Sequence, residues 1–588
     1  MTQIPFIPET APFAPEQRAW LNGFLAGLFS PSPTASAALP ATNGAAKTGE
    51  PLLILFGSQT GTAEGLAKEI AKEAGGRGFT PSIFALNDFD KAGFAAAKKA
   101  VIISSTWGEG EPPDNAAGFW SWLNAGSVPR LEQLNFAVLG LGDKNYSDFC
   151  GASKKIDSRL EMLGAKRIHP RGECDADYEA AAKKWTDELW EKLGGATGAT
   201  APAPAIPDGA TITKPVKTAF SKSHPFPARL LKNILLNRGG SAKEVRHFEI
   251  GLGGSGLNYE VGDALGVMPE NCSALVAEVV AAIGATGDEP VAVDDGIIPL
   301  RRALVQKFDL GKPPGELLVE IARRLPAVEF ASLLALEKAD DLKKWLHGRD
   351  VLDLLMLAPK MFVPMELLPL LRKLAPRLYS ISSSPKAHPG EVHLTVSAVR
   401  YATHGRHRKG VASTFLADRA GDIVNVFVNP SHGFRPPSNG DTPMIMVGPG
   451  TGIAPFRAFL EEREATGAKG KNWLFFGDQK RAADFLYEEQ LLAWQKNNLL
   501  TRLDLAFSRD QAEKIYVQHR MMENAAGLWS WLENGAHFYV CGDASRMAKD
   551  VDDALHKIVE IAGGKSPDEA KAYVVKMKTD QRYQRDVY

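Results

Sequence analysis

Two glycine-containing loops of different chemistry lie far apart in this chain of 588 residues. Residues 58–64 read Ser-Gln-Thr-Gly-Thr-Ala-Glu and offer hydroxyl groups without a basic side chain. Such a loop suits a phosphate monoester held by hydroxyls and by N–H groups at a helix N-terminus. Residues 448–452 read Gly-Pro-Gly-Thr-Gly after an apolar run, and their glycines let the backbone approach a pyrophosphate. Two nucleotide sites of different kinds predict an electron relay.

Aromatic side chains occupy the loops that follow two further strand-like runs. Residues 105–112 contain Trp107, and residues 141–146 contain Tyr146. A flavin ring is flat and apolar on both faces, so an aromatic side chain on either side would hold it. Gly108 beside the ring would let a peptide turn toward flavin N5. With the hydroxyl loop these residues predict an FMN site, whereas taken alone they indicate ordinary packing.

The middle of the chain carries a second pair of nucleotide motifs, at residues 377–385 and 408–413. Arg377 can pair with a pyrophosphate, and Tyr379 can lie on a flavin face. Residues 410–413 can supply N–H donors at the start of a helix. In this order, before residues 448–452, the motifs resemble the FAD module of the ferredoxin-NADP reductase family.

Cationic and hydroxyl side chains follow the strand-like run 503–507, where the adenosine ribose of a dinucleotide would lie. Ser508, Arg509 and residues 514–518 supply a hydroxyl, a guanidinium and an ammonium group. This set suits a 2′-phosphate, whereas a carboxylate is expected for a bare 2′-hydroxyl. The residues predict NADPH rather than NADH; the alternative is a solvated cationic surface.

The C-terminal residues complete a candidate catalytic set. A terminal aromatic residue, Tyr588, can stack on a flavin and be displaced by nicotinamide, while Ser380, Cys541 and Asp586 can steer a hydride and stabilise ring charge. The alternative makes Cys541 a buried core thiol and Tyr588 a frayed end.

The elements that must position these residues alternate between strands and helices. In residues 51–194, strands at 52–56, 100–104 and 136–141 alternate with helices at 63–74, 152–163 and 178–193, which predicts a flavodoxin-like, doubly wound parallel sheet. Residues 195–215, with Ala-Pro-Ala-Pro at 201–204, indicate a linker. Residues 1–50 contain one helical pattern and then a flexible segment; the helix either docks a partner or caps the neighbouring domain.

Two further domains follow the linker. In residues 216–436, strands at 226–236, 245–250, 391–398 and 423–428 flank a helical insertion at about 270–375, with helical periodicity at 304–308 and 367–374. This pattern predicts a β-barrel interrupted by helices. Residues 437–588 return to α/β alternation, with strands at 444–447, 473–476, 503–507 and 538–541, and predict a Rossmann-like domain.

Composition excludes several other classes. Lys and Arg total 68 against 69 Asp and Glu, which gives no support for a nucleic-acid binder. The four cysteines form no C-x-x-C pair, so neither a disulfide framework nor a metal site is favoured. The apolar segment 21–29 falls far short of the about 20 residues that a membrane span requires. We predict a cytoplasmic protein without a membrane anchor.

From residue 52 to residue 588 the motif set resembles the diflavin reductase family, which includes cytochrome P450 reductase and the sulfite reductase flavoprotein. Within it, residues 14–29, 262–267, 376–380 and 582–588 most resemble the bacterial assimilatory NADPH-sulfite reductase α subunits.

The resemblance implies three sets of cofactor contacts. Those for FMN are Ser58, Gln59, Thr60, Gly61, Thr62, Ala63, Ser105, Thr106, Trp107, Gly108, Leu141, Gly142, Asp143, Asn145, Tyr146, Cys150 and Asp175. Those for FAD are Arg377, Leu378, Tyr379, Ser380, Thr395, Val396, Ser397, Tyr401, Gly410, Val411, Ala412, Ser413 and Tyr588. Those for NADPH are Thr451, Arg457, Ser508, Arg509, Lys514, Ile515, Tyr516, Val517, Gln518 and Asp550.

The resemblance also implies a reaction: NADPH reduces FAD, FAD reduces FMN, and FMN reduces a separate haemoprotein. The expected acceptor is the sulfite reductase β subunit, since no cysteine set here could hold an iron-sulfur cluster for sulfite chemistry. One alternative is a general NADPH-haemoprotein reductase of the cytochrome P450 type, and a remote one is a non-catalytic nucleotide-binding regulatory protein. The N-terminal segment is a candidate for homo-oligomer contacts.

Overall fold

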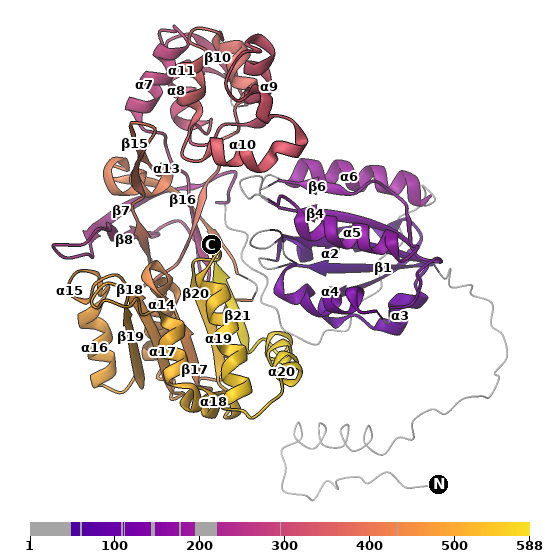
Figure 1. Ribbon diagram of the computed structural model, residues 1–588, viewed down its shortest axis with the longest axis vertical. Helices are drawn as coiled ribbons and strands as arrows, with labels where there is room; N and C mark the ends of the chain where they lie inside the picture. Colours follow the sequence, from indigo (N-terminus) through magenta and orange to yellow (C-terminus); the bar gives the residue numbers. More distant parts are fainter. Residues whose placement is uncertain are drawn as a thin grey trace, which may run out of the picture. The chain divides into compact units, whose positions relative to one another are not determined.

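A computed structural model describes residues 49–58, 61–106, 110, 112–126, 128–142, 148–175, 178–194, 220–294, 296–431 and 433–588. These residues form three large sheets with helices between and around their strands (Figure 1). The predicted N-terminal helix and the linker lie outside the described residues. In the described part of the chain, no helix is both long and apolar enough to cross a membrane.

The first sheet is parallel throughout, with strand order β2-β1-β3-β4-β5 and β6 paired to β4. The three predicted strands are present; β2 was not predicted, since only Phe79 of its residues is buried and it contains Pro81, a residue tolerated on an edge strand. The strands are β1 (Glu50–Gly57), β2 (Phe79–Ala85), β3 (Lys99–Ser105), β4 (Asn135–Leu141), β5 (Lys166–Arg167) and β6 (Gly172–Cys174).

Helices cover both faces of this sheet, because alternate strand residues point to opposite sides. Ile54 and Val101 pack with one helical layer, whereas Leu55 and Ile102 pack with the other. The first layer contains α2 (Thr62–Gly76) and α6 (Tyr178–Leu193); the second contains α3 (Lys91–Ala96), α4 (Ala117–Asn124) and α5 (Gly151–Met162). The doubly wound, flavodoxin-like class is therefore confirmed.

The second sheet is antiparallel, with order β12-β9-β16-β7-β8-β13. A bridge between Ile381 and Leu394 joins its two end strands and closes the predicted barrel. A hairpin of β14 (Arg400–Thr403) and β15 (Arg406–Lys409) leads to the short helix α13 (Val411–Thr414). The barrel strands are β7 (Phe226–Leu235), β8 (Val245–Gly251), β9 (Ala264–Val267), β12 (Arg377–Ser380), β13 (Glu391–Ser397) and β16 (Ile423–Asn429).

The insertion in the barrel has its own apolar core. Its predicted helical segment at 367–374 is wrong in detail: the α-helix ends at Leu367, and a 3₁₀ turn, Leu368–Leu370, follows. Pro369 has no N–H to continue the helical hydrogen bonds. The helices are α7 (Ser273–Ala282), α8 (Leu300–Gln306), α9 (Gly315–Arg324), α10 (Ala339–Leu346), α11 (Val351–Leu357) and α12 (Pro364–Leu367), with a hairpin of β10 (Pro290–Val293) and β11 (Gly296–Pro299).

The third sheet is again parallel, with order β19-β18-β17-β20-β21. Its strands are β17 (Met444–Val447), β18 (Asn472–Asp478), β19 (Arg502–Phe507), β20 (His537–Gly542) and β21 (Tyr583–Val587). The last strand was not predicted, because its sequence Tyr-Gln-Arg-Asp-Val lacks an apolar run. Pairing with β20 fixes the C-terminal residues as an edge strand.

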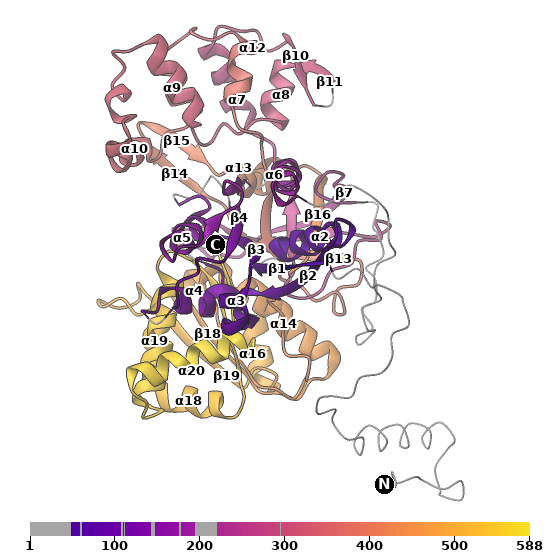
Figure 2. The same cartoon turned by 90° about the vertical axis from the view of Figure 1, so that its right-hand side faces the viewer.

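Helices also cover both faces of this sheet (Figure 2). One core contains residues of α17 (Val517–Glu523), α18 (Ala525–Glu533), α19 (Met547–Ile561) and α20 (Pro567–Thr579). The other contains residues of α14 (Ile453–Thr466) and α16 (Glu488–Lys496), and α15 (Arg481–Asp484) lies between β18 and α16 in the sequence. Val245 of the barrel joins this second core, so apolar packing connects barrel and sheet.

Candidate functional site

Ser380, Cys541 and Asp586 come together from three distant segments. Cys541 and Asp586 are direct neighbours in the parallel pair β20 and β21. Ser380, the last residue of β12, donates a hydrogen bond from Oγ to Asp586 Oδ2 at 2.6 Å. Cys541 Sγ lies 3.9 Å from the same oxygen. A hydroxyl, a thiol and a carboxylate thus meet where the barrel contacts the third sheet.

Burial controls the ionisation of this cluster. It raises the pKa of the Cys541 thiol well above its usual value, and the Asp586 carboxylate raises it further, so the thiol is neutral at physiological pH. Burial also raises the pKa of Asp586, and the hydrogen bonds from Ser380 and Cys541 act in the opposite direction. On balance the pKa of Asp586 is raised, so the cluster holds one buried carboxyl group beside a hydroxyl and a neutral thiol. In its ionised form this carboxyl group can stabilise developing positive charge.

Tyr588 is anchored rather than frayed. Its N–H donates to the carbonyl of Gly542 at 3.0 Å, and its own carbonyl accepts from the N–H of Ala544 at 3.1 Å. Its hydroxyl lies 2.7 Å from Thr451 Oγ1, at the turn of residues 450–452, while 55% of the residue remains exposed. The ring is thereby held beside the glycine loop with surface still available for stacking.

Deleting Tyr588 should relax the discrimination between the two nicotinamide cofactors. If the ring covers the flavin face, only a well-anchored dinucleotide displaces it easily, and its loss should lower the NADPH-to-NADH ratio of kcat/KM by about tenfold. Steady-state kinetics with both cofactors measure this ratio. Tyr588→Phe is the matched control, because it keeps the ring and loses only the bond to Thr451. A ratio unchanged in the truncated protein would remove the ring from this role.

The glycines of the loop at 448–452 serve two different purposes. A Cβ atom on Gly452 would collide with the carbonyl oxygen of Cys541, and one on Gly448 would lie 2.5 Å from the carbonyl oxygen of Gly452. Those two glycines are required by packing within the protein. Gly450 has φ +58°, and a Cβ there would meet nothing nearer than Asp478 at 3.8 Å and Lys243 at 3.9 Å. Packing within the protein therefore does not account for the glycine at position 450, and the space beside it is open to a ligand.

An ion pair that no sequence pattern predicts lies beside Gly450. Lys243 Nζ donates to Asp478 Oδ1 at 2.5 Å, across 235 positions of sequence. Burial raises the pKa of Asp478 while Lys243 lowers it, and the other carboxylate oxygen is buried without a hydrogen-bond partner among the described residues. Lys243 precedes β8 in the barrel, so a cation from the barrel adjoins the candidate pyrophosphate loop.

The predicted 2′-phosphate residues form a row after β19. The N–H groups of Ser508 and Arg509 donate to the carbonyls of Asp478 and Gln479 at 2.9 and 2.8 Å, which fixes the backbone and leaves the Arg509 side chain exposed. Gln518 Nε2 donates to Asp550 Oδ2 at 3.1 Å. Of the others, Lys514 and Tyr516 are exposed, Ile515 is half-buried and Val517 is buried.

The predicted FAD residues lie on β12, β13, β14 and α13. Arg377 donates to the carbonyl of Ala375 at 2.9 Å, and more than a third of its side chain is exposed. Gly410 packs closely, since a Cβ there would lie 2.7 Å from Ser413 Oγ, which accepts a bond from the N–H of Val399. Leu378 and Tyr401 are about half exposed. Tyr379, Ser397 and Val411 are half-buried, and Val396 and Ala412 are buried. The Thr395 hydroxyl instead bonds to that of Tyr487 at 2.6 Å.

Most predicted FMN residues follow the carboxyl ends of parallel strands, which lie at one edge of the first sheet. Ser58 Oγ accepts from the N–H of Ala63 at 3.2 Å, and Gly61 precedes α2 with φ +82°. Thr106 Oγ1 is buried without a hydrogen-bond partner in the described chain, as a site for a polar ligand would leave it. Also on or next to strand or helix ends are Thr62, Ser105, Leu141, Gly142, Cys150 and Asp175.

The remaining FMN predictions concern a buried thiol and residues outside the described part of the chain. Burial raises the pKa of Cys150 to about 12, so this thiol is a neutral core group. Sequence reasoning missed Asn115, whose Oδ1 accepts from the N–H of Ser58 at 2.8 Å. Seven predicted residues lie outside the described chain, namely Gln59, Thr60, Trp107, Gly108, Asp143, Asn145 and Tyr146.

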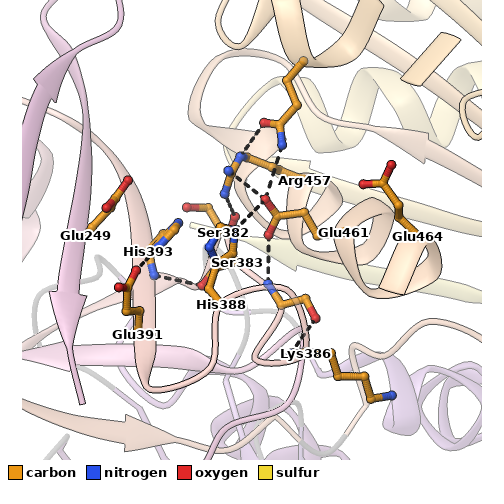
Figure 3. Close-up of polar contacts among 12 residues, drawn as sticks. Glu249, Ser382, Ser383, Lys386, His388, Glu391, His393, Arg457, Glu461 and Glu464 are labelled. Atoms are coloured by element: carbon orange, nitrogen blue, oxygen red, sulfur yellow. Dashed lines mark hydrogen bonds and ion pairs between the residues drawn. The ribbon is translucent and has the colours of Figure 1, made fainter. Parts of the chain in front are cut away.

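Arg457 stands apart from the other predicted NADPH residues. Its guanidinium is buried, donates to the carbonyl of Ser382 at 2.5 Å and pairs with Glu461 at 2.7 Å (Figure 3). These partners face the barrel. A nucleotide phosphate would have to displace them to reach the charge.

Two buried histidines lie on the same outer face of the barrel. Burial first, and then the charge of Arg457, lowers the pKa of His247 to about 4. Burial also lowers the pKa of His393 to about 2, assisted by the neighbouring His247 and His388. Both imidazoles are therefore neutral in the folded protein at physiological pH.

Acid should destabilise the protein through these two histidines. The unfolded-state pKa of a histidine is about 6.5, so below that pH the unfolded chain binds protons at these two positions and the folded protein does not. The folding stability that the protein has above that pH is therefore lost as pH falls. Between about pH 6 and 4.5 each histidine should cost about 1.4 kcal/mol per pH unit. Melting temperatures of wild type and His393→Gln, recorded across this range, measure the effect. An equally steep decline in the variant would contradict it.

Comparison with known proteins gives matches along the whole chain. Three family models match in order: Flavodoxin at residues 54–185, FAD binding domain at 218–415 and Oxidoreductase NAD-binding domain at 446–553. Three similar relatives carry the name sulfite reductase [NADPH] flavoprotein alpha-component. That of Bacillus subtilis is 44% identical over 97% of this chain and 95% of the relative. That of Vibrio vulnificus is 41% identical over 100% and 96%, and that of Salmonella arizonae 42% over 98% and 96%.

Proposed function

The chain belongs to the family of NADPH-sulfite reductase flavoprotein alpha-components, and from this premise we propose that it passes electrons from NADPH through FAD and FMN to a haemoprotein that reduces sulfite to sulfide. The observation that carries the proposal is the bond of 2.6 Å between Ser380 and Asp586. It joins the strand expected to hold the flavin to the sheet expected to hold the nicotinamide nucleotide.

Flavins, when bound, accept a hydride and release electrons singly. The protein supplies orientation and electrostatics around them. In its ionised form, Asp586 would place a negative charge beside a bound nicotinamide and so favour loss of hydride, and the Ser380 hydroxyl holds the Asp586 carboxyl group in place. Tyr588 would hold its ring against the face of a bound flavin and would give way to the nicotinamide.

We assign the three cofactors to successive parts of the chain. FMN belongs to residues 51–194, with Ser58 capping the phosphate loop and Thr106 offering its buried hydroxyl. FAD belongs to residues 216–436, with Arg377 toward the pyrophosphate. NADPH belongs to residues 437–588, with Gly450 at its pyrophosphate and Arg509 at its 2′-phosphate.

A haemoprotein partner completes the reaction. The four cysteines of the sequence are all free, and Cys150, Cys174 and Cys541 are buried. Sulfite reduction therefore belongs to a separate subunit, as the expected β subunit would provide. Free cysteines also favour the reducing cytoplasm as the location. We assign homo-oligomer contacts to residues 1–50, which truncation followed by sedimentation analysis would test.

The decisive experiment supplies the purified, flavin-loaded protein with NADPH and the same organism's sulfite reductase haemoprotein, with cytochrome c as a generic acceptor. Sulfide formed from sulfite, together with cytochrome c reduction, is the expected result. Cytochrome c reduction without sulfide would indicate a general haemoprotein reductase. Failure to reduce either acceptor would support a regulatory nucleotide-binding protein.

A further inference from the structure

Arg457 and Glu461, one turn apart on α14, hold the segment that follows Ser380. Arg457 Nη1 donates to the carbonyl of Ser382 at 2.5 Å, and Glu461 Oε2 accepts from the N–H of Ser384 at 3.0 Å. The two side chains also form an ion pair of 2.7 Å. The helix α14 thus binds one backbone carbonyl and one backbone N–H group of the barrel (Figure 3).

The side chains of Arg457 and Glu461 are buried, and the nitrogens of the guanidinium all contact polar groups of the protein. Arg457 is 7% exposed and Glu461 3%. Arg457 Nε donates to Gln490 at 2.8 Å, and its guanidinium carbon lies 5.0 Å from the centre of the Tyr487 ring. Each nitrogen of the guanidinium therefore has a partner inside the protein. A buried ion pair seldom adds net stability over apolar packing, whereas its fixed partners define the relative position of the two segments that it joins.

The helix α14 connects the contacts of Arg457 and Glu461 to the nucleotide loop. The 3₁₀ turn Gly450–Gly452 runs directly into α14 at Ile453, so Arg457 lies about one helical turn beyond the end of the candidate pyrophosphate loop. On the other side, Ser382 is two residues from Ser380. A short, rigid path thus runs from the nucleotide loop through Arg457 to the residue that binds Asp586.

A second carboxylate reinforces the same segment from outside. Glu462 accepts from Ser384 Oγ at 2.6 Å and from Lys386 Nζ at 2.5 Å. The side chain of Lys386 is 55% exposed, so water screens this pair, unlike the pair of Arg457 and Glu461. The buried pair is therefore the one expected to set the position of residues 382–384.

We propose that Arg457, with Glu461, is a positioning residue for hydride transfer, which sets the register between the nucleotide loop and Ser380, and that it does not bind the nucleotide. The inference rests on the proposed function, since it needs NADPH and flavin to meet at this junction. It gives Arg457 a role different from the NADPH contact that the family resemblance implies.

The test compares Arg457→Ala with a matched control on the same helix. Arg463 is also buried, at 3% exposure, but it donates to Thr442, Gly470 and Asn472, all within the third-sheet region. Arg463→Ala therefore removes a buried arginine of α14 without touching the barrel. Arg457→Lys keeps one donor for the Ser382 carbonyl and should recover part of any loss.

Three measurements on the full-length, flavin-loaded protein separate the possibilities. In Arg457→Ala we expect the limiting rate of flavin reduction by NADPH in stopped flow to fall by about tenfold or more, since small misplacements of reacting groups have effects of this size. The dissociation constant of NADP⁺ should stay within about twofold of wild type. Amide hydrogen exchange at residues 382–386 should accelerate. Arg463→Ala should leave that exchange unchanged even if it lowers the melting temperature.

Each contrary outcome has a distinct meaning. Weaker NADP⁺ binding with an unchanged limiting rate would make Arg457 a nucleotide ligand and overturn the inference. Unchanged hydrogen exchange at residues 382–386 in Arg457→Ala, with normal flavin reduction by NADPH, would show that Arg457 and Glu461 do not hold this segment. A wild-type protein that NADPH does not reduce would instead overturn the proposed function, and the role in hydride transfer with it.

Discussion

Replacing Asp586 with alanine should lower the limiting rate of flavin reduction by NADPH by about 10²-fold, which is the usual effect of removing one preorganised electrostatic contact from a transition state. Asp586 Oδ2 receives the Ser380 hydroxyl at 2.6 Å, and Cys541 lies next to it. The Ser380 hydroxyl and the Cys541 thiol are neutral, so Asp586 is the group of this cluster that can carry a negative charge. Its loss removes stabilisation of the nicotinamide cation that forms as hydride leaves.

Stopped-flow absorbance at a flavin wavelength gives the limiting rate directly, and titration with NADP⁺ tests whether binding survives. Asp586→Asn should have a smaller effect, because the amide oxygen can still accept from Ser380 although the charge is gone. Asp580→Ala is a suitable control, since its partly exposed carboxylate pairs with Lys576 at 2.7 Å, outside the cluster. A rate within twofold of wild type in Asp586→Ala would show that the carboxylate does not act on the reaction.

The strands that form the sheet interiors were predictable from their sequences. Residues 444–447 and 473–476 are apolar throughout because β17 and β18 are buried on both faces. The strand β21 was missed for the converse reason: at a sheet edge only Tyr583 and Val587 are buried, so no apolar run marks it. The fold class and the family were confirmed, whereas the details of edge strands and of the proline-interrupted segment at 367–374 required the structure.

The residue types of the candidate site could be predicted from the sequence, but their contacts could not. The resemblance pointed to Ser380, Cys541 and Asp586, but the hydrogen bond between Ser380 and Asp586 spans 206 positions, and local periodicity carries no information on such a pair. Arg457 is the clearest example of a residue whose contacts the sequence does not reveal. The resemblance implied a nucleotide contact for Arg457, yet only the fold reveals that the carbonyl of Ser382 and the Glu461 carboxylate already satisfy its guanidinium.

Arg509→Ala should weaken NADPH far more than NADH. Within the part of the chain that the structure describes, the side chains of Arg509 and Lys514 are exposed and no carboxylate is paired with them, so they are available to a phosphate. A charge-assisted contact of this kind contributes about 1.5 to 3 kcal/mol, which corresponds to a rise of about 10- to 150-fold in the dissociation constant.

Calorimetric titration with NADP⁺ and NAD⁺, together with kcat/KM for both reduced cofactors, measures the selectivity of this effect. Lys571→Ala is the matched control, because it removes one exposed positive charge from α20 without approaching the row after β19. High salt should reduce the difference between wild type and Arg509→Ala, since the contact is electrostatic and exposed to solvent. Equal losses for NADPH and NADH would place the 2′-phosphate elsewhere, because only a residue that touches that phosphate can distinguish two cofactors that differ in nothing else.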